Sequence, residues 1–217
     1  MGKIDFTPIQ QIFFDEISND KIVYSRFYFT GGTALSVFHF GHRYSDDLDF
    51  FTQNPFEKEL VVDLMTDICR PKKFHLQYTD HERVKIFNIY KKEKPLLKVD
   101  FAYYPYTRLE TGQKVGNITV DSLLDIGANK IAALSGRYEA KDLVDLYFLL
   151  KKFTVWDLWY AAQKKFKLDL DIVLIAADFL YVEKIETLPK MILPLTLPEL
   201  KTFFREEAKK LAKTVVE

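Results

Sequence analysis

Two patterns of apolar and polar residues alternate along this chain, and together they predict both helices and strands. Apolar residues recurring every three or four positions predict helices over residues 7–18, 56–70, 121–151, 155–166, 171–186 and 197–215. Short apolar or alternating runs between turn residues predict strands over 26–30, 47–52, 74–79, 83–90, 96–103 and 114–120. The sequence therefore predicts a strand-containing core with an N-terminal helix over residues 1–120, followed by a helical C-terminal portion over residues 121–217.

The strand predicted over 47–52 carries two carboxylates. Asp47 and Asp49 are two positions apart, so on a strand both point to the same face, about 6.6 Å apart along the backbone. Leu48 and Phe50 suit a buried sheet. A stiff element would thus hold two carboxylates that can converge on a metal ion, although such a pair also occurs on solvated strand edges.

A pair of glycines precedes that strand. Gly31 and Gly32 follow the strand over 26–30, and a short helix is predicted from Thr33 or Gly32 to about residue 40. Glycine lets the backbone approach a ligand closely, and free N–H groups at a helix start bind phosphate. The pair can also be a plain turn. Together with the carboxylates, however, Gly31–Thr33 would supply both sites that a magnesium-bound nucleoside triphosphate needs.

A third carboxylate, Asp100, lies in the middle of the apolar strand predicted over 96–103. Burying a carboxylate is costly unless it is paired or bound to a metal. The alternative is that the strand face shared by Lys98 and Asp100 is wet. The residues alone leave both possibilities open.

The loop before Asp47 contains further polar residues. Arg43 can pair with an adjacent aspartate, Asp46 or Asp47, or with a triphosphate, and Ser45 can hydrogen-bond the loop backbone, as serine often does in turns. His39 and His42 lack the partner residues that a metal-binding histidine on a helix face normally has. Arg43 and Ser45 are therefore candidate nucleotide-binding residues, and the histidines are not candidate ligands.

The helices predicted over 121–151 carry charged residues that have several possible roles. Lys130 lies on an otherwise apolar helix, and Asp142 and Asp145, three residues apart, share a face of the next one. These residues can be solvated helix faces, or Lys130 can form a salt bridge with either aspartate. Lys130 can also contact a triphosphate, because an ammonium is a compact charge suited to phosphate.

Composition narrows the partners and the location. The chain has 217 residues with 31 basic and 31 acidic side chains, so it is not a general polyanion binder, and contact with RNA would need a local patch such as the basic helix around Lys201–Lys213. Cys69 is the only cysteine, which fits a reducing compartment. The start has no apolar signal region, and the best apolar run, 172–182, is too short to span a membrane. We expect a cytoplasmic protein with no membrane contact.

Four stretches resemble a known family. GGTAL and HRYSDDLDFF, at 31–35 and 42–51, resemble the active-site motif of DNA polymerase β-like nucleotidyltransferases, and within that superfamily they look like the AbiEii/AbiGii toxin family. KIAAL at 130–134 and the pattern R-x-x-x-K-D-x-x-D-L-Y at 137–147 look like that family's second signature block. The resemblance covers most of residues 26–150. It implies an α+β fold, in which a mixed sheet with flanking helices forms the core.

The resemblance also implies a chemistry and residue roles. Asp47, Asp49 and Asp100 would bind Mg²⁺ or Mn²⁺, the glycine turn would cradle the phosphates of ATP, GTP or CTP, Lys130 would contact the triphosphate, and Asp142 would be the catalytic helix aspartate, with Asp145 as the alternative. Three carboxylates can hold two metal ions that stabilise the attacking and leaving oxygens. The implied reaction transfers a nucleoside monophosphate to an RNA acceptor such as tRNA, and the implied partner is a cognate antitoxin.

Two other functions remain open from the sequence. One is a nucleotidyltransferase that modifies a protein, and the other is a catalytically inactive module that binds nucleotide and a partner. The intact carboxylates argue against the inactive module. A metal-dependent turnover assay separates the three.

Overall fold

The computed structural model describes residues 5–216, so the first four residues of the predicted core and Glu217 lie outside the described range. The chain forms two compact units. The sheet unit comprises described residues 5–39, 45–107 and 111–122, and the helical unit comprises 40–44, 108–110 and 123–216. Two short segments that precede residue 121, namely 40–44 and 108–110, thus belong to the helical unit. The predicted boundary after residue 120 groups both segments with the core.

The sheet unit is built on a seven-stranded mixed sheet in the order β3-β4-β5-β2-β1-β7-β6. Its strands are β1 (Tyr28–Thr30), β2 (Asp47–Thr52), β3 (His75–Asp80), β4 (Val84–Lys91), β5 (Lys94–Tyr103), β6 (Gln113–Val115) and β7 (Ile118–Val120). β2 runs parallel to β5 and antiparallel to β1, while β1 runs parallel to β7. The predicted fold class, a mixed sheet with flanking helices followed by a helical part, is confirmed.

A row of phenylalanine rings forms the core on one face of this sheet. Phe87, Phe101, Phe50 and Phe29 come from β4, β5, β2 and β1 in spatial order, all fully buried, with successive ring centroids 5.9, 5.3 and 5.2 Å apart. Helix α1 (Pro8–Asn19) adds Phe14, whose ring lies 5.0 Å from that of Phe29. Because side chains alternate along a strand, the residues immediately before and after each of these phenylalanines point to the opposite face of the sheet.

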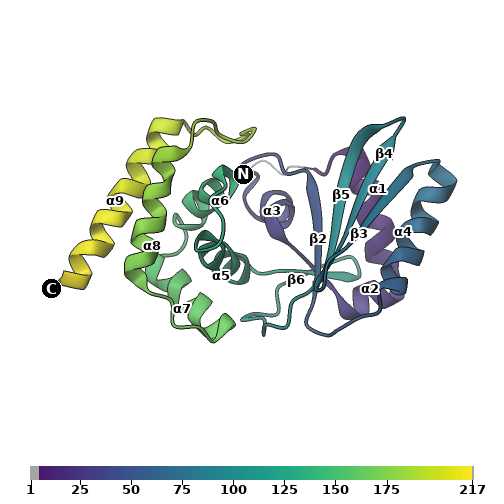
Figure 1. The fold of residues 1–217 in the computed structure, drawn as a ribbon, viewed down its shortest axis with the longest axis horizontal. Helices are drawn as coiled ribbons and strands as arrows, with labels where there is room; N and C mark the ends of the chain where they lie inside the picture. The colour runs from purple at the N-terminus through teal and green to yellow at the C-terminus, as the bar shows by residue number, and fades with distance from the viewer. Residues whose placement is uncertain (1–4, 217) are drawn as a thin grey trace. The chain divides into compact units, whose positions relative to one another are not determined.

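The helices of the sheet unit lie on both sides of the sheet, with α1 and α4 (Lys58–Lys72) on one side and α3 (Gly31–Ala34) on the other (Figure 1). Thr7 caps α1 in a capping box with Gln10. The helix predicted to end before Pro71 includes that proline in its last turn and stops at Lys73, which has the left-handed conformation at φ 54°.

Three local predictions in the sheet unit were wrong. The strand predicted from Arg26 begins only at Tyr28, because residues 21–26 form a short helix, α2 (Lys21–Arg26), whose first N–H groups are capped by the Asp20 carboxylate. The helix expected to follow a glycine turn starts at Gly31 itself and continues as a π-helix over Leu35–Phe40. The single edge strand predicted over 114–120 is a hairpin of β6 and β7.

The helical unit contains α5 (Leu123–Leu134), α6 (Ala140–Leu149), α7 (Val155–Phe166), α8 (Ile172–Phe179) and α9 (Leu197–Val216). A 3₁₀ turn over Leu180–Lys184 replaces the end of the helix predicted to reach 186. Helix α5 packs against α6, α7 and α8, and α9 packs against α6 and α8. Within the described range, no helix combines the length and the apolar character needed to cross a membrane.

Candidate active site

Three carboxylates share one face of the sheet unit. Asp47 and Asp49 alternate along β2 with Leu48 and Phe50, which are fully buried in the phenylalanine core. On the adjacent strand β5, Asp100 lies directly opposite Asp49 in the parallel register. The predicted adjacency of Asp100 to the other two is therefore confirmed. Its role as a metal ligand stays a prediction.

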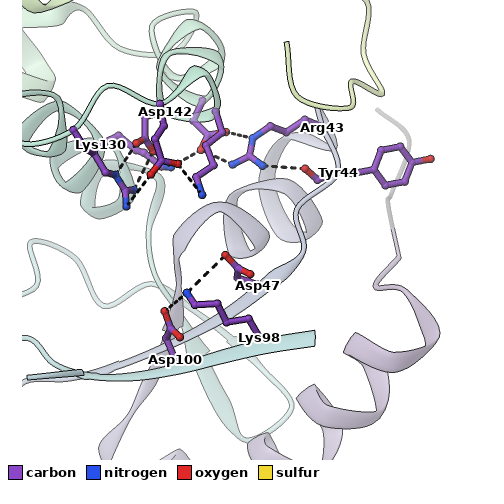
Figure 2. A network of polar contacts seen from close by, with 11 residues as sticks. Arg43, Tyr44, Asp47, Lys98, Asp100, Lys130 and Asp142 are labelled. Atoms are coloured by element: carbon purple, nitrogen blue, oxygen red, sulfur yellow. Dashed lines mark hydrogen bonds and ion pairs between the residues drawn. The ribbon is translucent and has the colours of Figure 1, made fainter. Parts of the chain in front are cut away.

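A lysine lies among these carboxylates. Lys98 is opposite Asp47 in the register of β2 and β5, and its Nζ is 2.5 Å from Asp100 Oδ2 and 4.0 Å from Asp47 Oδ2 (Figure 2). Burial alone would lower the pKa of Lys98, but the hydrogen bond and charge of Asp100 and the charges of Asp47 and Asp49 outweigh burial and raise the pKa. The lysine is thus a cation at neutral pH. Strand alternation was the signal for it, because Lys98 and Asp100 are two residues apart.

Gly31 closes this carboxylate face at the start of α3. Its φ is +78°, and a Cβ built on it would overlap Asp49 Oδ2 and lie 2.8 Å from Asp49 Cγ and 3.1 Å from Asp49 Cβ. Any side chain here would therefore meet both a disfavoured backbone conformation and the carboxylate itself. The sequence requires glycine because the backbone packs directly against Asp49.

A pair of glycine substitutions tests this close approach. Gly31→Ala is expected to lower the free energy of unfolding by about 2–4 kcal/mol, since the cost of positive φ and the cost of overpacking add. Gly116→Ala is the matched control, because Gly116 has φ +59° and open space around its built Cβ, so it incurs only the backbone cost of about 1 kcal/mol. Urea denaturation measures both, and equal losses would contradict the close packing of Gly31 against Asp49.

The start of α3 leaves its first N–H groups without a side-chain cap from the preceding residue. Thr30 is the N-cap residue and makes no capping bond; its hydroxyl donates instead to Asp121 Oδ2 at 2.9 Å. The Thr33 hydroxyl donates to the backbone carbonyl of Asp47, which ties α3 to the start of β2. Gly31, Gly32 and Thr33 therefore begin a helix beside the carboxylates, in the arrangement expected of a phosphate cradle.

The carboxylate face has the donor chemistry of a magnesium site. Mg²⁺ prefers oxygen ligands and is usually bound by one or two carboxylates together with substrate phosphates and water. Among the residues that the structure describes, no three carboxylate, histidine or cysteine groups form a ready-made metal cage. The ammonium of Lys98 nevertheless shows that these carboxylates accept a cation between them. Asp47, Asp49 and Asp100 therefore fit a metal that is completed by a bound triphosphate.

The helical unit contains a second charged group of residues, which we call the buried charge cluster: His42, Arg43, Lys130, Arg137, Asp142 and Asp145. Lys130 Nζ lies 2.7 Å from Asp142 Oδ1 and 2.5 Å from Asp145 Oδ2 (Figure 2). Both carboxylates are fully buried, and Lys130 is 7% exposed. Lys130 is therefore not on a solvated helix face, and both salt bridges that the sequence left as alternatives are present.

Arg43 is bound within the same cluster. It donates from Nε and Nη2 to the two oxygens of Asp145, at 2.7 and 2.8 Å. Asp145 was not among the partners that the sequence suggested for Arg43, which were Asp46, Asp47 or a triphosphate. The same short segment is joined to residues 190–193 by backbone hydrogen bonds of His42 and Tyr44. Arg43 thus fixes residues 40–44 onto the helical unit.

The electrostatics of the cluster favour charged aspartates. Burial would raise the pKa of Asp145, but the positive charges of Lys130 and Arg43 and hydrogen bonds from His42 and Arg43 hold that pKa far below its usual range. The pKa of Lys130 is raised, because the two carboxylates outweigh burial. Burial lowers the pKa of His42, so the neutral ring donates from Nε2 to Asp145 at 2.7 Å. Arg137 completes the cluster with a bond from Nε to Asp142 at 2.8 Å.

Ser45, a predicted nucleotide-binding residue, and His39, which was not a candidate, both make hydrogen bonds that involve the backbone. The carbonyl of Ser45 accepts a hydrogen bond from Gln10 Nε2 at 2.7 Å, which ties the start of α1 to the loop before β2. His39 donates from Nε2 to the carbonyl of Asp121 at 3.0 Å. Sequence reasoning missed another buried ion pair, between Lys165 Nζ and Asp125 Oδ1 at 2.7 Å, in which neither side chain is exposed.

The fold is shared with solved structures. JHP933 from Helicobacter pylori is 20% identical, with a TM-score of 0.56 over 97% of each chain. MenT4, the nucleotidyltransferase toxin Rv2826c from Mycobacterium tuberculosis H37Rv, is 15% identical, with a TM-score of 0.54 over 94% of this chain and 82% of that one. At these identities the likeness concerns the fold, and that fold is the one expected of a nucleotidyltransferase.

The sequence comparisons define the family. The family model described as nucleotidyl transferase AbiEii toxin, type IV TA (toxin–antitoxin) system, matches residues 20–215. An uncharacterized protein from Aquifex aeolicus (strain VF5) is 31% identical over 164 residues, which cover 72% of this chain and 74% of that protein. The chain belongs to the AbiEii family of nucleotidyltransferase toxins. The resemblance inferred from its motifs is thereby confirmed.

Proposed function

We propose that this nucleotidyltransferase uses Mg²⁺ or Mn²⁺ to transfer a nucleoside monophosphate from a nucleoside triphosphate to an RNA acceptor, specifically tRNA. The observation that carries the donor half is the shared face of Asp47, Asp49 and Asp100, with the start of α3 beside it. Membership of a family of toxin–antitoxin systems supports a cognate antitoxin as partner. The RNA acceptor is proposed from the family resemblance of the motifs. The basic residues of α9 are a candidate RNA contact.

The chain's own residues would act mainly by positioning. Asp47, Asp49 and Asp100 would hold the metal, which supplies charge stabilisation to the triphosphate when it is bound. The N–H groups of Gly31, Gly32 and Thr33 would orient the phosphates, so that an acceptor hydroxyl meets the α-phosphorus in line with the departing pyrophosphate. Phosphoryl-type transfer of this kind depends on orientation and electrostatics more than on covalent catalysis by the protein.

For the buried charge cluster we propose a supporting role. Lys130, Asp142 and Arg43 were expected to serve the nucleotide, whereas in the structure Lys130 and Arg43 bind carboxylates of the helical unit. Arg43 lies four residues before Asp47 in the chain. The cluster would therefore act on the reaction by fixing the segment that leads into β2, while Ser45 anchors the same loop through its backbone.

A labelling experiment tests the proposed reaction. The protein is incubated with each α-labelled nucleoside triphosphate in turn, with Mg²⁺, and with either total RNA or total cell protein. Label is expected in the tRNA fraction, with Asp47→Ala as the blank and Asp67→Asn as a matched control, because Asp67 lies on α4 with 72% of its side chain exposed. Label in protein would instead establish a protein-modifying transferase. Nucleotide binding with no label in either fraction would point to an inactive binding module.

A further inference from the structure

Lys98 lies where a cation is needed and is itself a cation. Its ammonium lies between carboxylates of two neighbouring strands, 2.5 Å from Asp100 and 4.0 Å from Asp47. The register of β2 and β5 puts Lys98 and Asp100 opposite Asp47 and Asp49, so these four residues form a square of three negative charges and one positive charge. Strands are stiff, and the three carboxylates cannot spread apart to relieve their repulsion.

The lysine also has room to leave this position. The side chain of Lys98 is 36% exposed and that of Asp47 is 37% exposed, whereas that of Asp100 is only 14% exposed. A lysine stem has four carbons and many rotamers, so its head can move into water with little change of the backbone. The ammonium can therefore be exchanged for another cation at Asp100 without rearranging the sheet.

We infer that Lys98 is a tethered competitor of the metal ion, which neutralises the carboxylate face in the metal-free enzyme and withdraws from Asp100 when metal binds. This inference rests on the proposed metal-dependent function. Lys98 is a positioning residue, because it acts on the carboxylates that receive the metal. Its charge keeps the affinity for free metal low, so that the metal is retained mainly together with a triphosphate, whose own negative charge offsets that of the lysine.

The magnitude follows from the charges involved. Metal binding requires the ammonium to give up its attraction to Asp100 and Asp47. Even at the dielectric constant of water, two such pairs within about 4 Å together weaken metal binding by at least about tenfold, and a less polar surrounding enlarges the effect. Removing the charge of Lys98 is therefore expected to tighten the binding of free metal by at least about tenfold. A lysine that merely stabilises the fold would give the opposite result or none, because its loss would leave the carboxylates more mobile.

The test uses Mn²⁺ alone as the probe, with free Mn²⁺ measured by electron paramagnetic resonance during titration of the full chain. Lys98→Met removes the charge at similar length, and Lys98→Arg keeps it. Lys94→Met is the matched control, since Lys94 is exposed at the start of the same strand. Lys98→Met should bind Mn²⁺ at least about tenfold more tightly than the wild type, and Lys98→Arg and Lys94→Met should stay close to the wild type.

Melting temperatures give a second readout that does not depend on activity. Lys98→Met should be less stable than the wild type without metal and should gain more from added Mn²⁺, because binding to the folded state stabilises it in proportion to affinity. Unchanged or weaker Mn²⁺ binding by a folded Lys98→Met variant would overturn the inference. Binding of Mn²⁺ by the wild type in the same experiment would leave the proposed function intact. Failure of both the wild type and Lys98→Met to bind free Mn²⁺ would also overturn the inference. Failure of both to bind Mn²⁺ in the presence of a non-hydrolysable nucleoside triphosphate would in addition overturn the proposed function.

Discussion

Replacing Asp47 with asparagine is expected to reduce nucleotidyl transfer by on the order of a thousandfold, with little change in stability. Asparagine keeps the shape of the side chain but removes one of the negative charges that would hold the metal on the triphosphate. Asp47 is partly exposed at the first position of β2 and supports no core packing. Transfer of label from an α-labelled triphosphate at saturating Mg²⁺ measures the effect, and thermal unfolding measures the stability.

The control for this variant is Asp67→Asn, which removes the same charge from an exposed position on α4. It should transfer label at the wild-type rate. A loss of less than about tenfold in Asp47→Asn would mean that the carboxylate does not contact the reacting phosphates through a metal. A matching loss in Asp67→Asn would mean that the effect is one of net charge.

Lys130→Met is expected to destabilise the helical unit by about 3–5 kcal/mol, because it leaves two buried aspartates without their central cation. A lysine that only contacted a triphosphate could be replaced with little change in stability, whereas Lys130 lies between Asp142 and Asp145, all three of them buried. Denaturant unfolding measures the loss, which for a chain of this size corresponds to a decrease of roughly ten degrees in melting temperature.

Lys141→Met is the matched control for Lys130→Met. Lys141 lies on α6 and pairs with Glu139, but its side chain is 41% exposed, and exposed ion pairs contribute less than about 1 kcal/mol. If both lysine variants lost the same small amount, the buried charge cluster would not stabilise the fold. A normal stability of Lys130→Met with a raised KM for the triphosphate would restore the nucleotide-binding role.

The buried charge cluster also determines how the stability of the fold depends on pH. The pKa values of Asp142 and Asp145 are lowered in the folded state, so their contribution is complete above the unfolded value of about 4 and is lost as pH falls towards the folded values. The pKa of Lys130 is raised, so its contribution is complete below about 10 and is lost as pH rises through the folded value. The pKa of His42 is also lowered in the folded state, because the ring is buried, so its contribution is complete only above the unfolded value of about 6.5. The cluster therefore stabilises the fold fully between about pH 6.5 and pH 10.

The shared carboxylate face of β2 and β5 could be predicted from the sequence because its determinants are local. The two-residue spacing of Asp47 and Asp49 places both side chains on one face of a strand. Asp100 lies in an apolar strand, where a carboxylate is costly to bury unless it is paired or bound to a metal. Lys98 carries the same two-residue signal relative to Asp100, and the sequence left open whether the strand face that they share is wet. Charge type alone does not show that an ammonium lies between carboxylates of two strands.

The buried charge cluster could not be predicted, because its partners are distant in the chain. Arg43 and Asp145 are 102 residues apart, and nothing near Arg43 indicates that its partner is on α6 and not in its own loop. The apolar composition of residues 26–30 predicted a strand that starts at Arg26, whereas Arg26 is the last residue of the short helix α2, which is capped by Asp20. Helix existence was predicted well where the periodicity was long, as in α7 (Val155–Phe166).

The central claim, that the carboxylate face of β2 and β5 binds a metal-bound triphosphate, is tested most directly by calorimetric titration. A non-hydrolysable nucleoside triphosphate is titrated into the wild type and into the double variant Asp47→Asn with Asp49→Asn, each with Mg²⁺ and with a chelator in its place. The account predicts Mg²⁺-dependent binding to the wild type and no such binding to the double variant. Equal Mg²⁺-dependent binding to both proteins would contradict it.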